Sequence, residues 1–176
     1  MSTAADGSAA YREVQRFSQV WIWVLIILSS LVLLGIFGYG AVTQLILGRP
    51  FGDPPMPDWL LAVLVAFSAL VAVVMPCLFR AVKLVTEVRD DGLYVQFFPL
   101  RVRRIAFADI EQCEARTYRP LWEYGGWGIR WGFHGKAYNV SGNRGVQLTL
   151  TGGKRLLIGS QQADELADAV RARMVR

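Results

Sequence analysis

The sequence predicts a two-helix transmembrane hairpin followed by an α+β domain, whose antiparallel strands form a barrel or sandwich closed by one C-terminal helix. Three observations lead to this fold class. Two long runs contain no charged residue, and the segments after them alternate in polarity as strands do. The final residues then change to a helical period. A chain of 176 residues has room for one small domain beside such an anchor.

The apolar runs are "VWIWVLIILSSLVLLGIFGYGAV" and "WLLAVLVAFSALVAVVMPCLF". A helix crosses the bilayer's hydrocarbon core, about 30 Å thick, with about 20 apolar residues. A soluble core able to bury two such helices would need far more protein than this chain has. The first run is too long for a signal peptide and lacks a following cleavage site, so it is a retained anchor. We therefore predict a hairpin over residues 18–80, with spans at about 20–42 and 59–79.

Basic residues on either side of the two runs predict the orientation. Arg12 and Arg16 precede the first run, and Arg80 and Lys83 follow the second, whereas the connecting loop holds one Arg and two Asp. The positive-inside rule then places both termini in the cytoplasm, in a multi-pass protein of the cell (plasma) membrane. Residues 1–17 are predicted to be a polar N-terminal tail, and their start, "MSTAADGSAA", is typical of disordered chain.

Strand patterns dominate residues 81–176. The segment "KLVTEVRDDGLYVQFF" is predicted to form a β-hairpin that turns at its Asp-Gly pair. In the next strand, "RVRRIAF", alternation directs Arg101 and Arg103 outward and Val102 inward. A further hairpin, "GVQLTLTGGKRLLIGS", is expected to turn at its Gly-Gly pair.

The segment "SQQADELADAVRARM" predicts the closing helix. Ser160 is its candidate N-cap, acidic residues occupy its first turn and arginines its last. Leu166, Val170 and Met174 recur every four residues, which gives an apolar stripe that must dock on the sheet.

The strand-rich order closed by one helix resembles bacterial pleckstrin-homology-like (PH-like) domains. The segment "GNRGVQLTLTGGKRLLIGSQQADELADAV" resembles their closing hairpin and capping helix, and "AFADI" resembles the segment that leads into a middle strand. The two spans match small prokaryotic membrane proteins in which one or two helices anchor a PH-like domain. Such families are mostly uncharacterised. The resemblance therefore implies a PH-like fold over residues 81–176 and a membrane location, but no reaction.

A stretch from Trp122 to Gly145 is unusual, with three Trp, two Tyr, one Phe and seven Gly in 24 residues. At a period of two, Trp127, Ile129, Trp131 and Phe133 share one apolar face, which we expect to meet the core, the C-terminal helix or the membrane. Glycines on the opposite face are typical of a close approach by another backbone or a ligand. We expect a strand pair in this stretch.

Three interpretations of this strand pair remain open. The first is core packing with glycine bulges, and the second is an interfacial wedge of Trp side chains. The third is a groove that holds an anionic group. The candidate contacts to an anionic group or the membrane are Arg130, Lys136, Arg144, Trp127 and Trp131.

Residues for catalysis or metal binding are scarce. His134 is the chain's single histidine, and Cys77 and Cys113 are not spaced for zinc or redox chemistry. No Walker motif is present, and the short "RVRR" cluster has β spacing rather than that of a basic helix. We therefore expect no enzyme activity, no catalytic or metal-binding residue, no cofactor and no nucleic-acid partner.

The residues after Phe79 carry 16 Lys and Arg against 10 Asp and Glu, a net charge of +6. Such charge suits either the anionic surface of the cytoplasmic leaflet or ordinary solvation. We expect a non-catalytic binding or scaffolding module at the cytoplasmic membrane face. Its expected partners are the lipid bilayer, anionic lipid headgroups, a second copy of the chain or a membrane protein. The alternative is an accessory or regulatory subunit that a membrane complex recognises through the two spans.

Overall fold

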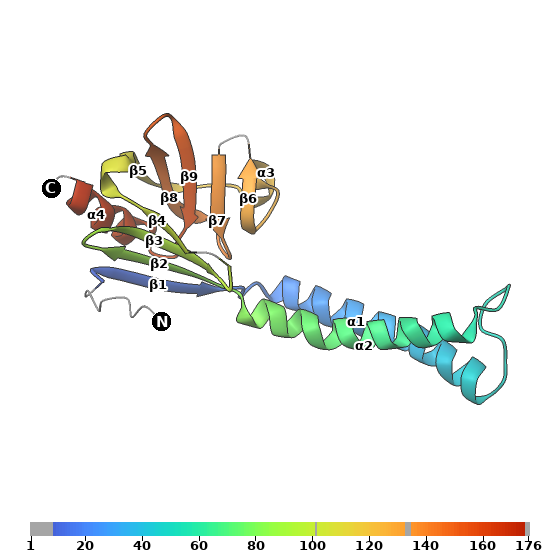
Figure 1. Ribbon diagram of the computed structural model, residues 1–176. Helices are drawn as coiled ribbons and strands as arrows, with labels where there is room; N and C mark the ends of the chain where they lie inside the picture. Colours follow the sequence, from blue (N-terminus) through green and yellow to red (C-terminus); the bar gives the residue numbers. More distant parts are fainter. Residues whose placement is uncertain (1–8, 101, 133–134, 175–176) are drawn as a thin grey trace. The chain divides into compact units, whose positions relative to one another are not determined.

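The computed structural model describes residues 9–100, 102–132 and 135–174, which divide into two compact units (Figure 1). One unit is the helical segment Gln19–Arg80. The other unit, the β module, combines the described residues up to Ser18 with those from Ala81 onward. The helical segment is therefore inserted in the chain between two parts of one β module.

The helical unit is a hairpin of two long apolar helices. Helix α1 (Val20–Ala41) continues into a π-helical turn, η1 (Val42–Ile46), and α2 (Asp58–Ala81) follows the connecting loop. The two candidate spans contain 27 and 24 residues, each with a mean hydropathy of 2.7 in its most apolar part. At about 1.5 Å per residue, both exceed a hydrocarbon core of about 30 Å. The prediction of two helices long and apolar enough to cross a membrane is confirmed.

The first sheet of the β module begins before the helices. Its four antiparallel strands follow chain order: β1 (Tyr11–Arg16), β2 (Lys83–Arg89), β3 (Gly92–Phe98) and β4 (Val102–Ile105). The predicted tail over residues 1–17 is thus wrong for Tyr11–Arg16, which pair with β2 along their whole length. Only Tyr11 and Gln15 of this strand are buried, so its apolar pattern is weak. Residues 1–8 lie outside the described residues.

Glu13 ties strand β1 to the start of the C-terminal helix region. Its carboxylate accepts hydrogen bonds from the Tyr11 hydroxyl at 2.7 Å, the Ser160 hydroxyl at 2.7 Å and the Gln161 backbone N–H at 2.8 Å. The buried Gln15 amide adds a bond to the Gly159 carbonyl at 2.7 Å. These contacts join residues almost 150 positions apart in the chain.

We expect Glu13→Ala to lower the stability of the β module by about 2 kcal/mol, because three donors lose a charged acceptor. Thermal unfolding of the full chain in neutral detergent, followed by near-UV circular dichroism, measures this loss. Glu165→Ala changes an exposed carboxylate and serves as the control. An unchanged midpoint for Glu13→Ala would show that strand β1 does not depend on this tie.

The second sheet has five strands in the order β5-β8-β9-β7-β6. Strands β8 and β9 form the predicted hairpin, and a second hairpin, β6–β7, joins its edge through parallel pairing of β7 with β9 (Figure 1). A short helix, α3 (Pro120–Tyr124), precedes β6. The strands are β5 (Ile110–Thr117), β6 (Gly128–Gly132), β7 (Gly135–Asn139), β8 (Arg144–Leu150) and β9 (Lys154–Gly159).

The two sheets and the C-terminal helix α4 (Ala163–Met174) share one hydrophobic core. The predicted stripe is confirmed, since Leu166 and Val170 are fully buried and Met174 packs against the same core. The Ser160 hydroxyl accepts the N–H of Gln162 at 3.0 Å, in the turn before the helix. Two sheets followed by a C-terminal helix are therefore confirmed.

Strand β4 faces the opposite way from its prediction. Val102, expected to point inward, is 52% exposed, whereas Arg103 is half-buried and shares a face with the buried Ile105. Strand alternation places Val102, opposite Gln96, on the face that does not contribute to the core. Arg101 lies outside the described residues.

Candidate functional site

The Trp- and Gly-rich stretch forms the predicted strand pair, β6–β7, with helix α3 before it. Its glycines allow backbones to approach closely. A Cβ at Gly132 would overlap the carbonyl oxygen of Glu123 in α3, and a Cβ at Gly135 would overlap that of Arg155 in β9. Packing against α3 and β9 therefore explains Gly132 and Gly135.

Strand β6 has the predicted apolar face, but only part of that face packs against the core. Ile129 pairs with Tyr138 and packs against the main core, and Trp131 pairs with Lys136 at the hairpin's end. Trp131 is 72% exposed. Of the coverings that we expected for this face, the core covers Ile129, while Trp131 is left exposed in the β module. Phe133 lies outside the described residues.

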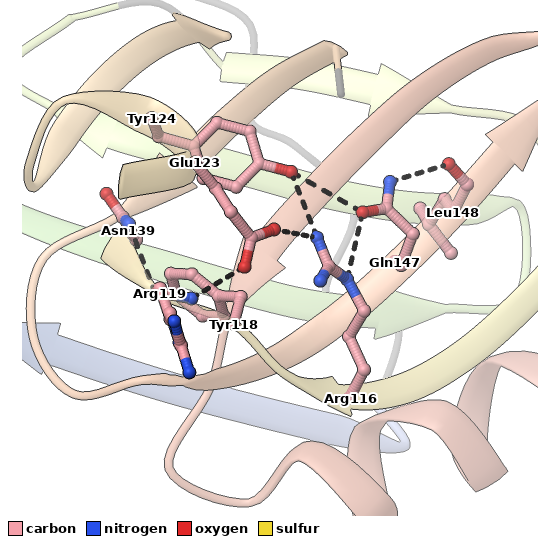
Figure 2. A network of polar contacts seen from close by, with 8 residues as sticks. All are labelled: Arg116, Tyr118, Arg119, Glu123, Tyr124, Asn139, Gln147 and Leu148. Atoms are coloured by element: carbon pink, nitrogen blue, oxygen red, sulfur yellow. Dashed lines mark hydrogen bonds and ion pairs between the residues drawn. The ribbon is translucent and has the colours of Figure 1, made fainter. Parts of the chain in front are cut away.

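A network of polar contacts joins helix α3 to strand β5 (Figure 2). Arg116 of β5 donates to the Glu123 carboxylate at 2.7 Å, and Glu123 also accepts the backbone N–H of Arg119 at 2.7 Å. Nearby, the Tyr118 hydroxyl accepts a hydrogen bond from the Asn139 amide of β7 at 3.1 Å. Burial raises the pKa of Tyr118 to about 12, so its hydroxyl stays protonated. These contacts join α3 to β5 and the end of β7 to Tyr118.

A groove opens beside the hairpin's end, and we name it the Trp131 groove. Its first part has a volume of about 650 Å³ and lies between β4, the hairpin and the β8–β9 turn. Parallel pairing sets Lys136 beside Leu156, directly after Lys154 and Arg155. Four basic residues line this part: Arg103, Lys136, Lys154 and Arg155.

The second part of the groove, about 790 Å³, is mostly apolar. It shares Arg103, Trp131 and Lys136 with the first part. The Lys136 ammonium lies 4.6 Å from the centre of the Trp131 ring and 4.8 Å from that of Tyr138, so cation–π contacts hold it where the two parts meet. The apolar side chains here include Leu100, Val102, Ile129, Trp131 and Tyr138.

The groove's cations have no acidic residue beside them in the described groove lining. None of the described residues that line either part is acidic. Arg103, Lys136, Lys154 and Arg155 form no ion pair with any described residue. By contrast, Arg104, Arg144, Arg171 and Arg173 each pair with an aspartate. The groove therefore concentrates positive charge that the described residues leave uncompensated.

The structure brings together two of the five predicted site residues, Trp131 and Lys136. Arg130 points to the other face of β6, where its side chain donates to the Trp127 carbonyl at 3.0 Å. The Trp127 indole donates to the Gly142 carbonyl at 3.0 Å. Arg144 pairs with Asp164 of α4 at 2.9 Å. These three residues do not line the groove.

Sequence reasoning missed three residues that line the groove: Arg103, Lys154 and Arg155. The adjacent pair "KR" after the Gly-Gly turn was a visible signal, but basic residues are common beside exposed turns. His134 lies outside the described residues. Across the described residues, no group of three or more His, Cys, Asp or Glu side chains is arranged to hold a metal ion.

Cys113 lies on β5 against helix α4, and its thiol is 3.8 Å from the Ala167 carbonyl oxygen. Burial raises the pKa of this thiol to about 11. At pH 8 its reactive thiolate should be roughly 100-fold rarer than in an unperturbed cysteine. We expect the thiol of a Cys77→Ser chain to react with Ellman's reagent at least about tenfold more slowly when folded than in denaturant. Equal rates would show that the Cys113 site is open.

Comparison with known proteins gives one family. The sequence model described as "Family of unknown function (DUF6141)" matches residues 3–175. A search of curated proteins gave no match.

Proposed function

Because the chain belongs to DUF6141, a family of unknown function, we propose a function from its structure: a membrane-anchored, non-catalytic module that binds an anionic group. In this proposal the two apolar helices hold the chain in the cell membrane, and the β module lies at the cytoplasmic face. The Trp131 groove is the binding site. The anion is multiply charged, with phosphate as the best fit.

The observation that carries this proposal is the set of four basic side chains around one groove, without an acidic lining residue. Like charges gathered in this way repel one another, so a bound anion would relieve the repulsion as well as form ion pairs. Arginine presents a planar fork of donors that suits phosphate oxygens, and lysine adds a point charge. A phosphate group can accept bonds from several of these donors at once.

The membrane location is supported by helix length, hydropathy and flanking charge. Arg16 is four residues before α1, and Arg80 and Lys83 are at the end of α2 and the start of β2. The connecting loop holds one Arg and one Asp, and α2 begins at Asp58. The positive-inside rule then assigns the ends of both helices that join the β module to the cytoplasm.

The PH-like resemblance is consistent with two mainly antiparallel sheets followed by a C-terminal helix on their shared core. Two features add to that scheme. The helical hairpin is inserted between β1 and β2, and the β6–β7 hairpin extends the second sheet. The second feature supplies Trp131 and Lys136, so the proposed site depends on an addition to the scheme. We therefore base the function on the groove, because one fold hosts many ligands.

Calorimetric titration of the full chain with ethyl phosphate, in nanodiscs of neutral lipid, tests the proposal. Empty discs serve as the blank. We expect saturable binding that weakens at least about threefold between 0.05 and 0.3 M salt, because the contacts are exposed ion pairs. Absence of binding at tens of millimolar ligand would contradict the anion site. A partner bound only through the two spans would then become the better explanation.

A further inference from the structure

The Trp131 groove has an apolar part as well as a basic part, and the inference drawn from this rests on the proposed function. We propose that its ligand is an anionic amphiphile: a phosphate head held by the basic part and an alkyl chain lying along the apolar part. The two parts are continuous, because Arg103, Trp131 and Lys136 line both. A ligand whose head reaches Lys136 therefore has its remaining atoms beside the Trp131 ring.

Exposed apolar side chains around the second part support this ligand class. Leu100 is 57% exposed, Val102 52% and Trp131 72%, and all three line the same hollow. Grouped apolar exposure of this kind is typical of binding surfaces, whereas single exposed apolar residues need no explanation. A free anion such as inorganic phosphate would leave these side chains in water. An alkyl chain would cover them.

The position of Lys136 sets the orientation of the bound ligand. Its ammonium is held over two aromatic rings, at 4.6 Å from Trp131 and 4.8 Å from Tyr138, and it forms no ion pair with a described residue. An anion bound there keeps one side towards Lys154 and Arg155 and the other towards apolar atoms. This asymmetry distinguishes an amphiphile from a symmetric polyanion.

The test compares ethyl phosphate with hexyl phosphate on the full chain in neutral nanodiscs, with empty discs as the blank. Each buried methylene contributes about 0.8 kcal/mol, or roughly fourfold in affinity. With about half of the four added methylenes buried, hexyl phosphate should bind at least about tenfold more tightly. Equal affinities for the two compounds, with ethyl phosphate still bound, would overturn the amphiphile and leave the anion site standing. If neither compound binds, the proposed function itself fails.

A pair of variants locates the alkyl chain. Leu100→Ser with Val102→Ser should abolish most of the hexyl advantage, measured as the ratio of the two affinities, and ethyl phosphate that still binds saturably would show that the basic part of the groove is intact. Leu121→Ser with Trp122→Ser removes similarly exposed apolar side chains, 61% and 85% exposed, from α3 and should change neither affinity. An undiminished hexyl advantage in the first variant would overturn the assignment.

The same titration in discs containing phosphatidic acid, at 0.3 M salt to screen surface charge, distinguishes two sources of the ligand. A lower apparent affinity for hexyl phosphate indicates that bilayer lipid occupies the groove. Unchanged affinity indicates a soluble amphiphile. Both results support the same ligand chemistry.

Discussion

Lys154→Gln combined with Arg155→Gln is expected to weaken ethyl phosphate binding by about 5- to 30-fold. The two residues begin β9 and are exposed, so each should contribute about 0.5–1 kcal/mol to an ion pair with the ligand. The loss should be largest at low salt and shrink as screening increases. Calorimetric titration in neutral nanodiscs at two salt concentrations measures both effects.

The matched control removes the same charge outside the groove. Arg119→Gln with Arg130→Gln neutralises two exposed arginines that line neither part of the groove. Long-range charge alone would weaken binding equally in the two double variants. Site-specific contacts predict that only the Lys154 and Arg155 variant loses affinity. Equal losses would therefore contradict the assignment of the groove as the binding site.

The second large effect concerns Gly135, where the hairpin meets β9. We expect Gly135→Ala to lower the stability of the β module by about 3 kcal/mol or more. The residue has a φ of +102°, which strains any side chain, and a Cβ would overlap the Arg155 carbonyl oxygen. The overlap involves backbone, so it cannot be relieved by a side-chain rotation. Parallel pairing of β7 with β9 must then shift.

Gly153→Ala separates the two causes. Gly153 has a φ of +76°, but nothing lies within 4 Å of its Cβ position, so alanine there suffers backbone strain alone. We expect a loss of about 1 kcal/mol, and the difference between the variants measures the overlap. Thermal unfolding in neutral detergent gives both values. Because Lys136 follows Gly135 directly, Gly135→Ala should also weaken ethyl phosphate binding. Equal destabilisation by the two substitutions would show that β7 can shift away from β9 at little cost in free energy.

The elements predicted correctly are those with a strong local pattern. The two uncharged runs, the Gly-Gly turn and the stripe of Leu166 and Val170 each reveal their structure within a window of about 20 residues. Strand β1 has no such pattern. Its stabilising contacts come from Ser160 and Gln161, almost 150 residues away. A short polar segment followed by an apolar run therefore resembled a tail.

Only some of the residues that line the groove could be predicted from the sequence. Trp131 and Lys136 were candidates because they lie in the unusual Trp- and Gly-rich stretch. Arg130 and Arg144 were equally plausible by composition, but strand alternation turns Arg130 away and Asp164 neutralises Arg144. Alternation separates Arg130 from Trp131, but no local pattern shows that Asp164 pairs with Arg144 and leaves Lys136 without an acidic partner among the described residues.

By itself, the sequence determined two apolar helices, two hairpins around a Trp-rich strand pair, and an amphipathic closing helix. Each depends on the periodicity of neighbouring residues, because side-chain direction repeats along a helix or strand. Only the tertiary structure decided which charges meet. Parallel pairing of β7 with β9 sets Lys136 beside Leu156, directly after Lys154 and Arg155, and Arg103 of β4 lines the same groove. Such contacts join segments far apart in the chain, and their geometry follows from sheet order rather than from any local repeat.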